Sequence, residues 1–141
     1  MRIILDTNIL LSALLSPMGA PAGILDAWER KVFTLAACEE LIGELREVVS
    51  RPFFRARLRA GAGELLAAGI RDFSLFCRAL PAGAAAPDPK DTYLLALAEA
   101  GDAEYLVTGD KRLLSLRRYK STLIITAAAM VEILKQAESG G

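Results

Sequence analysis

The first eight residues of the chain constrain its fold more than any other stretch. A short apolar run at residues 3–5 is followed at once by Asp6, and a helical pattern of apolar residues starts at Ile9. Such a run predicts a strand that is buried on both faces, as in a parallel sheet. Open α/β sheets bind their ligands at the carboxyl ends of such strands. Asp6 is therefore the first candidate site residue.

The alternation of strand and helix patterns continues along the chain. Further strands are predicted at residues 32–36, 105–108 and 123–126; residues 73–80 are ambiguous, and we favour a strand at 75–80. Loops are predicted at residues 17–21 and 81–87, and helices at residues 22–30, 38–50, 62–72, 90–100, 111–116 and 127–136. This alternation predicts an α/β fold whose mainly parallel sheet is covered by helices on both sides. We expect one domain, residues 1–138, and a flexible tail, residues 139–141.

Composition excludes several classes of protein. With 141 residues, 53% of them hydrophobic, the chain can bury a sizeable core and is not disordered. No apolar stretch is long enough for a transmembrane helix, and no signal peptide pattern is present, so we expect no membrane contact. The only two cysteines, Cys38 and Cys77, lie in apolar surroundings without CxxC spacing. Reduced thiols of this kind are typical of a cytoplasmic protein.

Histidine is absent from the chain, and this excludes more chemistry than any other single observation. A Ser-His-Asp or Cys-His nucleophile system, a histidine base and a histidine metal ligand are all impossible. The sequence also has no GxSxG, GxxxxGK[ST] or GxGxxG motif. An enzyme built from this sequence would use carboxylates, and these favour hard ions such as Mg²⁺ or Mn²⁺.

Glu44 is the acid of the predicted helix at residues 38–50 that lies nearest the apolar stripe. At 100° per residue it falls beside Leu41 and Val48, whereas the other glutamates of that helix point further away. A carboxylate held against the protein body is costly unless it is paired. Its partner is either an arginine, such as Arg46 or Arg51, or a metal ion.

Three more acids stand at predicted helix starts. Asp88 fits a helix N-cap ahead of Pro89, and we assign it that structural role. Asp91 either completes a capping box or points inward as a ligand. Asp110 follows an apolar strand as Asp6 does, and it is either a cap or a ligand. Thr108 could donate its hydroxyl to a cap or to a bound water.

The order of the acids is more telling than any one of them. Asp6 and Asp110 end parallel strands, so they should meet at one edge of the sheet, where Glu44 and Asp91 could join them. Four converging carboxylates would repel one another and raise each other's pKa. One or two divalent ions would relieve that repulsion, and a pair of ions could activate water for phosphodiester cleavage.

The chain has 17 basic and 17 acidic residues and no net charge, but basic residues are concentrated in two stretches. Each alone is best explained as a solvated helix face. Taken together, the stretches at residues 51–59 and 111–120 could form a patch for phosphates. The candidates for nucleic-acid contacts are Arg51, Arg55, Lys111 and Arg112.

The chain resembles the PIN-domain nucleases, most closely those described as toxin components of toxin–antitoxin pairs. The resemblance rests on the segments LDTNILLSALL, LIGELREVV, DPKDTYLLALAEAGDAEYLVTGDKRLL and TAAAMVEIL. It implies a three-layer α/β/α sandwich with strand order 3-2-1-4-5, and RNA cleavage by metal-activated water with Mg²⁺ or Mn²⁺. The residues that match the family's acids and supporting polar positions are Asp6, Glu44, Asp91 and Asp110, with Asn8 and Thr108.

The resemblance also implies partners, and it has one departure. Members of the family are commonly homodimers, and the toxins pair with a small antitoxin protein. Thr92 stands where members often have Asn, and we expect it to tune the surroundings of the site. A DNA or flap nuclease of the same fold and a non-catalytic α/β binding module remain the alternatives.

Overall fold

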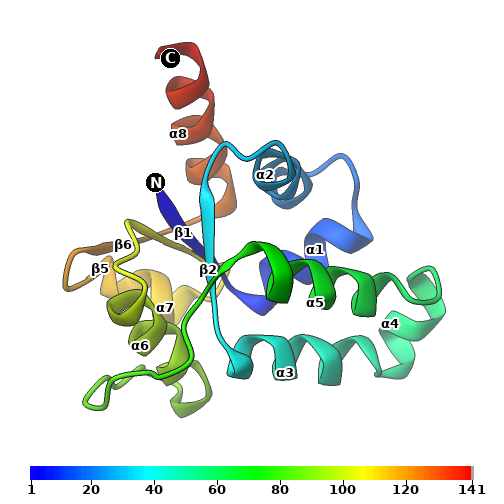
Figure 1. The fold of residues 1–141 in the computed structure, drawn as a ribbon, viewed down its shortest axis with the longest axis horizontal. Coiled ribbons are helices and arrows are strands. Elements are labelled where there is room, and N and C mark those ends of the chain that lie inside the picture. Colours follow the sequence, from blue (N-terminus) through cyan, green and yellow to red (C-terminus); the bar gives the residue numbers. More distant parts are fainter. Residues whose placement is uncertain (141) are drawn as a thin grey trace.

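The computed structural model describes residues 1–140, and a six-stranded sheet forms its centre (Figure 1). Its strands are β1 (Arg2–Leu5), β2 (Thr34–Ala37), β3 (Leu75–Phe76), β4 (Tyr105–Val107), β5 (Arg118–Tyr119) and β6 (Thr122–Ile125). They lie side by side in the order β3-β2-β1-β4-β6-β5. All neighbours pair in parallel except β5, which runs antiparallel to β6 at one edge.

Helices cover both faces of this sheet. They are α1 (Thr7–Leu15), α2 (Ala20–Glu29), α3 (Glu39–Val49), α4 (Pro52–Arg57), α5 (Ala62–Phe73), the short 3₁₀ helix η1 (Pro89–Asp91), α6 (Thr92–Ala100), α7 (Lys111–Leu116) and α8 (Ala127–Gly140). In Figure 1, α6 and α7 lie on one side of the sheet, and α1, α2, α3 and α5 lie on the other. Helix α8 packs against α2. This confirms the predicted α/β fold with a mainly parallel sheet.

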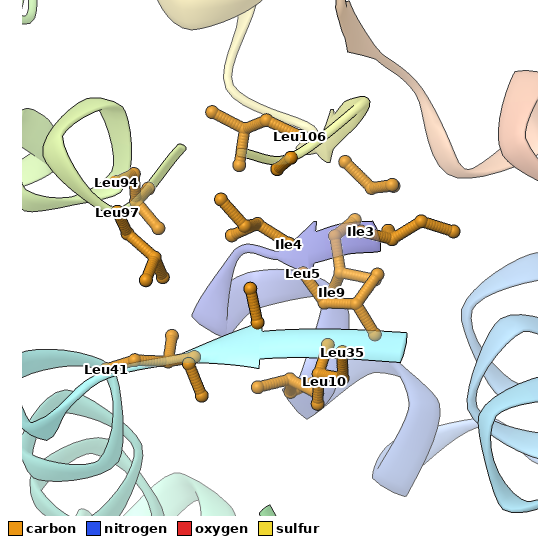
Figure 2. Close-up of a cluster of buried hydrophobic side chains, with 14 of the residues drawn as sticks. Ile3, Ile4, Leu5, Ile9, Leu10, Leu35, Leu41, Leu94, Leu97 and Leu106 are labelled. Atoms are coloured by element: carbon orange, nitrogen blue, oxygen red, sulfur yellow. The ribbon is translucent and has the colours of Figure 1, made fainter. Parts of the chain in front are cut away.

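The apolar run of β1 is the centre of the core. Ile3, Ile4 and Leu5 are at most 1% exposed, as expected for a strand with covered faces. Figure 2 shows Ile4 on the side of α6, near Leu94, whereas Leu10 of α1 lies on the other side of the strand. Because successive side chains of a strand alternate between faces, β1 ties the two helical layers together.

The sheet departs from the expected order only at its edges. Its five parallel strands follow the predicted order 3-2-1-4-5, with β6 as the fifth. The sequence patterns missed β5, a polar two-residue strand that forms a hairpin with β6 through Lys120, whose φ is 53°. The strand predicted at residues 75–80 is wrong in length. Only Leu75–Phe76 are paired, because the partner strand β2 ends at Ala37, just before α3 begins.

The helices also differ from the predictions in places. Helix α2 starts at Ala20 and contains Pro21 in its first turn, where proline needs no amide partner, so the loop predicted at residues 17–21 is too long. The basic stretch after residue 51 forms a separate helix, α4, that was not predicted. Helix α8 continues to Gly140, past the predicted end at residue 136. Of the predicted tail, Gly141 lies outside the described residues.

No single helix within residues 1–140 is long and apolar enough to cross a membrane. Helices α1 and α2 reach that length and composition only when they are taken together, and they are bent by 98° relative to each other.

Candidate functional site

Asp6 lies at the carboxyl end of β1 and is 4% exposed. It occupies the N-cap position of α1, yet its carboxylate makes no capping hydrogen bond. Instead, Asp6 Oδ2 accepts a hydrogen bond of 2.7 Å from Thr108 Oγ1. Burial raises the pKa of Asp6, the Thr108 hydroxyl lowers it, and the charge of Glu44 raises it again. Asp6 is thus a buried carboxylate whose side-chain partner is neutral.

Thr108 links the two strand-end acids. The register of β1 and β4 pairs Leu5 with Val107, so the residues that follow, Asp6 and Thr108, stand next to each other. The Thr108 hydroxyl donates to Asp6 and accepts a 3.1 Å hydrogen bond from the Asp110 amide. Because Thr108 is completely buried, the Asp6 carboxylate and the start of α7 are held in a fixed relation.

Asp110 uses one carboxylate oxygen to cap α7. Its Oδ1 accepts hydrogen bonds from the amides of Arg112, at 2.8 Å, and Leu113, at 3.4 Å. Asp110 therefore caps the helix, which is one of the two roles predicted for it from the sequence. It leaves Oδ2 with no hydrogen-bond donor in the described part of the chain, so capping and ligand binding do not exclude each other.

Asp91 is the acid whose pKa is affected by all the other acids of the site. It occupies the N-cap position of α6 without a capping hydrogen bond from its side chain. Its pKa is raised from the ordinary value of 3.8 to about 6. Burial is the largest cause, followed by four neighbouring carboxylates: Asp6, Asp110, Asp88 and Glu44. The fold therefore brings acids from four separate segments into one negative field.

Glu44 faces this field from α3. It is half-buried, and its negative charge raises the pKa of both Asp6 and Asp91. Neither arginine weighed as its partner contacts it. Arg46 pairs with Glu64, and Arg51 pairs with Glu47. Glu44 thus joins the cluster without an ion pair among residues 1–140.

The donor set of the cluster suits a hard divalent cation. Carboxylate oxygens are the ligands that Mg²⁺ and Mn²⁺ prefer, and no lysine or arginine forms an ion pair with Asp6, Glu44, Asp91 or Asp110 within the described chain. Within residues 1–140, however, no three acidic or thiol side chains are close enough to hold one ion together. The four acids are suitable ligands for Mg²⁺ or Mn²⁺, but their side chains are too far apart to hold one ion as they stand.

Asp88 and Arg112 form the rim of the cluster. As predicted, Asp88 caps the turn that precedes α6, because its Oδ1 accepts from the amide of Lys90 at 3.0 Å. Its Oδ2 accepts from the Arg112 guanidinium at 3.3 Å. This contact joins the start of η1 to α7 across the edge of the site.

Among the polar residues around the site, the structure adds one pair that the sequence did not suggest. The Tyr93 hydroxyl lies 3.5 Å from Thr7 Oγ1, and burial raises the Tyr93 pKa, as do the charges of Glu44 and Asp6. Nothing in the sequence marked Tyr93, because it reads as an ordinary core position of α6. Asn8 is exposed on the first turn of α1, and Thr92 Oγ1 accepts from the amide of Ala86, which anchors the preceding loop.

The four predicted nucleic-acid contacts are all exposed. Arg51 is paired with Glu47 and Arg112 with Asp88, so these two are partly neutralised. In the described chain, Lys111 and Arg55 form no ion pair. Lys111 begins α7 beside Asp110, whereas Arg55 belongs to α4, beyond the end of α3.

Comparison with known proteins agrees with this geometry. A family model described as a PIN domain matches residues 2–112, a range that includes every acid of the cluster. No curated protein and no solved structure matches the chain.

Proposed function

This chain belongs to the PIN domain family, and on that premise we propose that it is an endoribonuclease that requires Mg²⁺ or Mn²⁺. PIN domains in general are metal-dependent nucleases. RNA as the substrate, the identity of the ion and the role of each residue are our proposal. The alternative within the same fold is a DNA or flap nuclease.

The observation that carries the proposal is that Asp6, Glu44, Asp91 and Asp110 gather at one end of the sheet, and the raised pKa of Asp91 follows from it. Four other carboxylates contribute to that shift, and none of the acids proposed as ligands is matched by a cation in the described residues. Such an arrangement costs folding free energy, because like charges are held together where burial also disfavours them. Its persistence is explained if a divalent ion binds there.

Each residue has a specific part in the proposed mechanism. Asp6 and Asp110 would hold a catalytic ion, and Glu44 and Asp91 would complete the site or hold a second ion. When bound, the ion supplies an activated water for attack on phosphorus and offsets negative charge in the transition state. Thr108 fixes the orientation of the Asp6 carboxylate through its 2.7 Å hydrogen bond, and Asn8 offers an exposed amide beside it.

We further propose that the protein is the toxin of a toxin–antitoxin pair and acts as a homodimer. Support for a protein partner comes from an apolar groove of about 740 Å³ between α2 and α5. Its wall includes Leu65 and Phe73, which are 76% and 77% exposed, and large exposed apolar residues often mark an interaction surface. Expression alone should then slow growth, and expression together with a neighbouring antitoxin gene should restore it.

A cleavage assay tests the proposed activity. Wild type and Asp6→Asn are incubated with single-stranded RNA, single-stranded DNA and a flap substrate, with Mn²⁺, with Mg²⁺ and with a chelator. We expect metal-dependent cleavage of RNA by wild type and none by Asp6→Asn. Asp26→Asn is the matched control, because Asp26 is an exposed acid that pairs with Arg30 on α2.

The assay also separates the alternatives. Preferential cleavage of DNA or of the flap would show that the protein is a DNA or flap nuclease and not a ribonuclease. Equal cleavage by wild type and Asp6→Asn would remove Asp6 from the mechanism. No cleavage of any substrate, with either metal, would favour a non-catalytic binding module.

A further inference from the structure

A second groove, of about 580 Å³, lies where α3, α4 and α5 meet. The end of α3 supplies Val49 and Ser50, α4 and the turn after it supply Phe54 and Leu58, and the first turn of α5 supplies Gly63. Three arginines also line it, namely Arg46, Arg55 and Arg59.

The groove carries an excess of positive charge. Arg46 lies 3.4 Å from Glu64, which also lines the groove, and this contact offsets one charge. Arg55 and Arg59 are exposed, and no carboxylate within residues 1–140 forms an ion pair with either. Two free guanidinium groups thus face one hollow in a chain whose net charge is zero. Guanidinium groups are suited to bind phosphate oxygens in pairs.

The floor of the groove is closely packed. A methyl group added at Gly63 would come within 2.7 Å of Val49 Cγ2, so α5 approaches α3 as closely as only glycine allows. This contact fixes the start of α5 against the end of α3.

The groove and the acid cluster share helix α3. Glu44 lies in the middle of that helix, and Val49 lies five residues further along it, about 7.5 Å at a rise of ~1.5 Å per residue. At ~100° per residue the two positions also lie about 140° apart around the helix axis, so a single strand bound at the acids must pass around α3 to reach the groove.

We propose that this groove binds backbone phosphates of the RNA substrate, some nucleotides away from the cleaved bond. The inference rests on the proposed ribonuclease function and adds to it a second contact region. Arg55 and Arg59 are the main ligands, and Arg46 assists from α3. RNA is favoured over an acidic protein segment because the proposed substrate supplies closely spaced phosphates, and guanidinium groups such as those of Arg55 and Arg59 bind phosphate oxygens in pairs.

Binding measurements test the groove directly. All variants are made in the Asp6→Asn protein, so cleavage does not interfere, and the probe is a fluorescent single-stranded RNA of ~12 nucleotides. We expect the Arg55→Gln/Arg59→Gln double variant to bind the RNA roughly tenfold more weakly. The slope of the logarithm of the binding constant against the logarithm of the salt concentration should become less steep by about 1.4, as for two lost phosphate contacts.

Arg57→Gln is the matched control. Arg57 lies on the same helix and is exposed, but its guanidinium lies 3.7 Å over the Phe53 ring and does not line the groove. We expect it to change the affinity by no more than about twofold, as for a charge without a phosphate contact. Circular dichroism confirms that each variant is folded.

Substrate length gives an independent readout in the cleaving protein. A dinucleotide cannot reach the groove, so the Arg55→Gln/Arg59→Gln variant should cleave it as wild type does. With the longer RNA, its KM should rise roughly tenfold while kcat is unchanged, because only uniform binding is lost.

The outcomes separate this inference from the proposed function. If Asp6→Asn binds RNA but the double variant and Arg57→Gln lose affinity equally, the groove is not a specific subsite, and the nuclease proposal stands. If wild type neither binds nor cleaves RNA, both are overturned.

Discussion

Two junctions of the molecule have the same sequence pattern and use it differently. At the first, β1 ends, Asp6 follows and α1 begins; at the second, β4 ends and Asp110 precedes α7. Asp110 caps its helix with a carboxylate oxygen, whereas Asp6 stands at the cap position and makes no such bond. Asp6 is 4% exposed and Asp110 only half-buried.

The comparison shows which of the two carboxylates is less well compensated for its burial. A capping carboxylate compensates part of its desolvation with amide hydrogen bonds. For Asp6, burial raises the pKa, and the Thr108 hydroxyl and, more weakly, the backbone amides of Asn8 and Thr7 lower it without cancelling the rise. The β1–α1 junction thus holds a buried carboxylate with a raised pKa, which is typical of a functional position.

The largest expected effect is on activity at the β1–α1 junction. Asp6→Asn keeps the shape of the side chain and one oxygen that can accept from Thr108, but it removes the charge. We expect a loss of about 10³-fold in the cleavage rate, or about 4 kcal/mol of barrier. The thermal midpoint should stay the same or rise, because Asn relieves the repulsion with Glu44. A large fall in the midpoint would instead give Asp6 a structural role.

The link between the two junctions should matter next. Thr108→Val removes the hydroxyl that donates to Asp6 and accepts from the Asp110 amide. The buried Asp6 carboxylate and the partly buried Asp110 amide lose a partner, so we expect a destabilisation of about 2 kcal/mol. Urea denaturation measures this, and Thr34→Val on β2 is the control, because the Thr34 hydroxyl is exposed and forms no side-chain hydrogen bond within residues 1–140. Equal losses in both variants would contradict the link.

The second junction should respond to the loss of its cap. Asp110→Ala should destabilise the protein by about 1 kcal/mol, whereas Asp110→Asn should cost much less, because asparagine is also a good N-cap. Both variants should lose cleavage activity. If Asp110→Asn retains full activity, the carboxylate serves only as a cap.

Sequence patterns predicted the core of the fold because its signals are local and repeated. The apolar run at residues 3–5 and the helical spacing behind it identify β1 and α1, and the register of parallel strands then places Asp6 next to Thr108. The strand β5 was missed, because Arg118–Tyr119 are polar and pair only through the hairpin. Edge strands depend on their partners more than on their own residues.

The grouping of the four acids at one end of the sheet was predictable from the sequence, whereas their contacts were not. Helical spacing distinguished Glu44 from the other glutamates of α3. No spacing could show that Arg46 pairs with Glu64 or that Thr108 donates to Asp6, because those partners come from segments far apart in sequence. The Tyr93–Thr7 contact and the groove lined by α3, α4 and α5 could not be predicted for the same reason.

The smallest expected effect is a pH dependence of the metal-free protein. The pKa of Asp91 is raised from 3.8 to about 6 on folding. Its contribution to stability is therefore fully present below the unfolded value and is lost as the pH rises through about 6. Asp91→Asn should match wild type near pH 4 and be more stable by about 1 kcal/mol near pH 7, because solvent screens this partly exposed group. Paired urea titrations at both pH values, with Asp26→Asn as control, measure the difference; a constant difference would contradict the shift.

Calorimetric titration with Mn²⁺ tests the central claim, that the acids at the end of the sheet form a divalent-cation site. Wild type and Asp26→Asn should bind the ion with equal affinity, and Asp6→Asn should bind it at least about tenfold more weakly, because a charged ligand is lost. Absence of binding to wild type at millimolar Mn²⁺, or equal binding by Asp6→Asn, would contradict the claim.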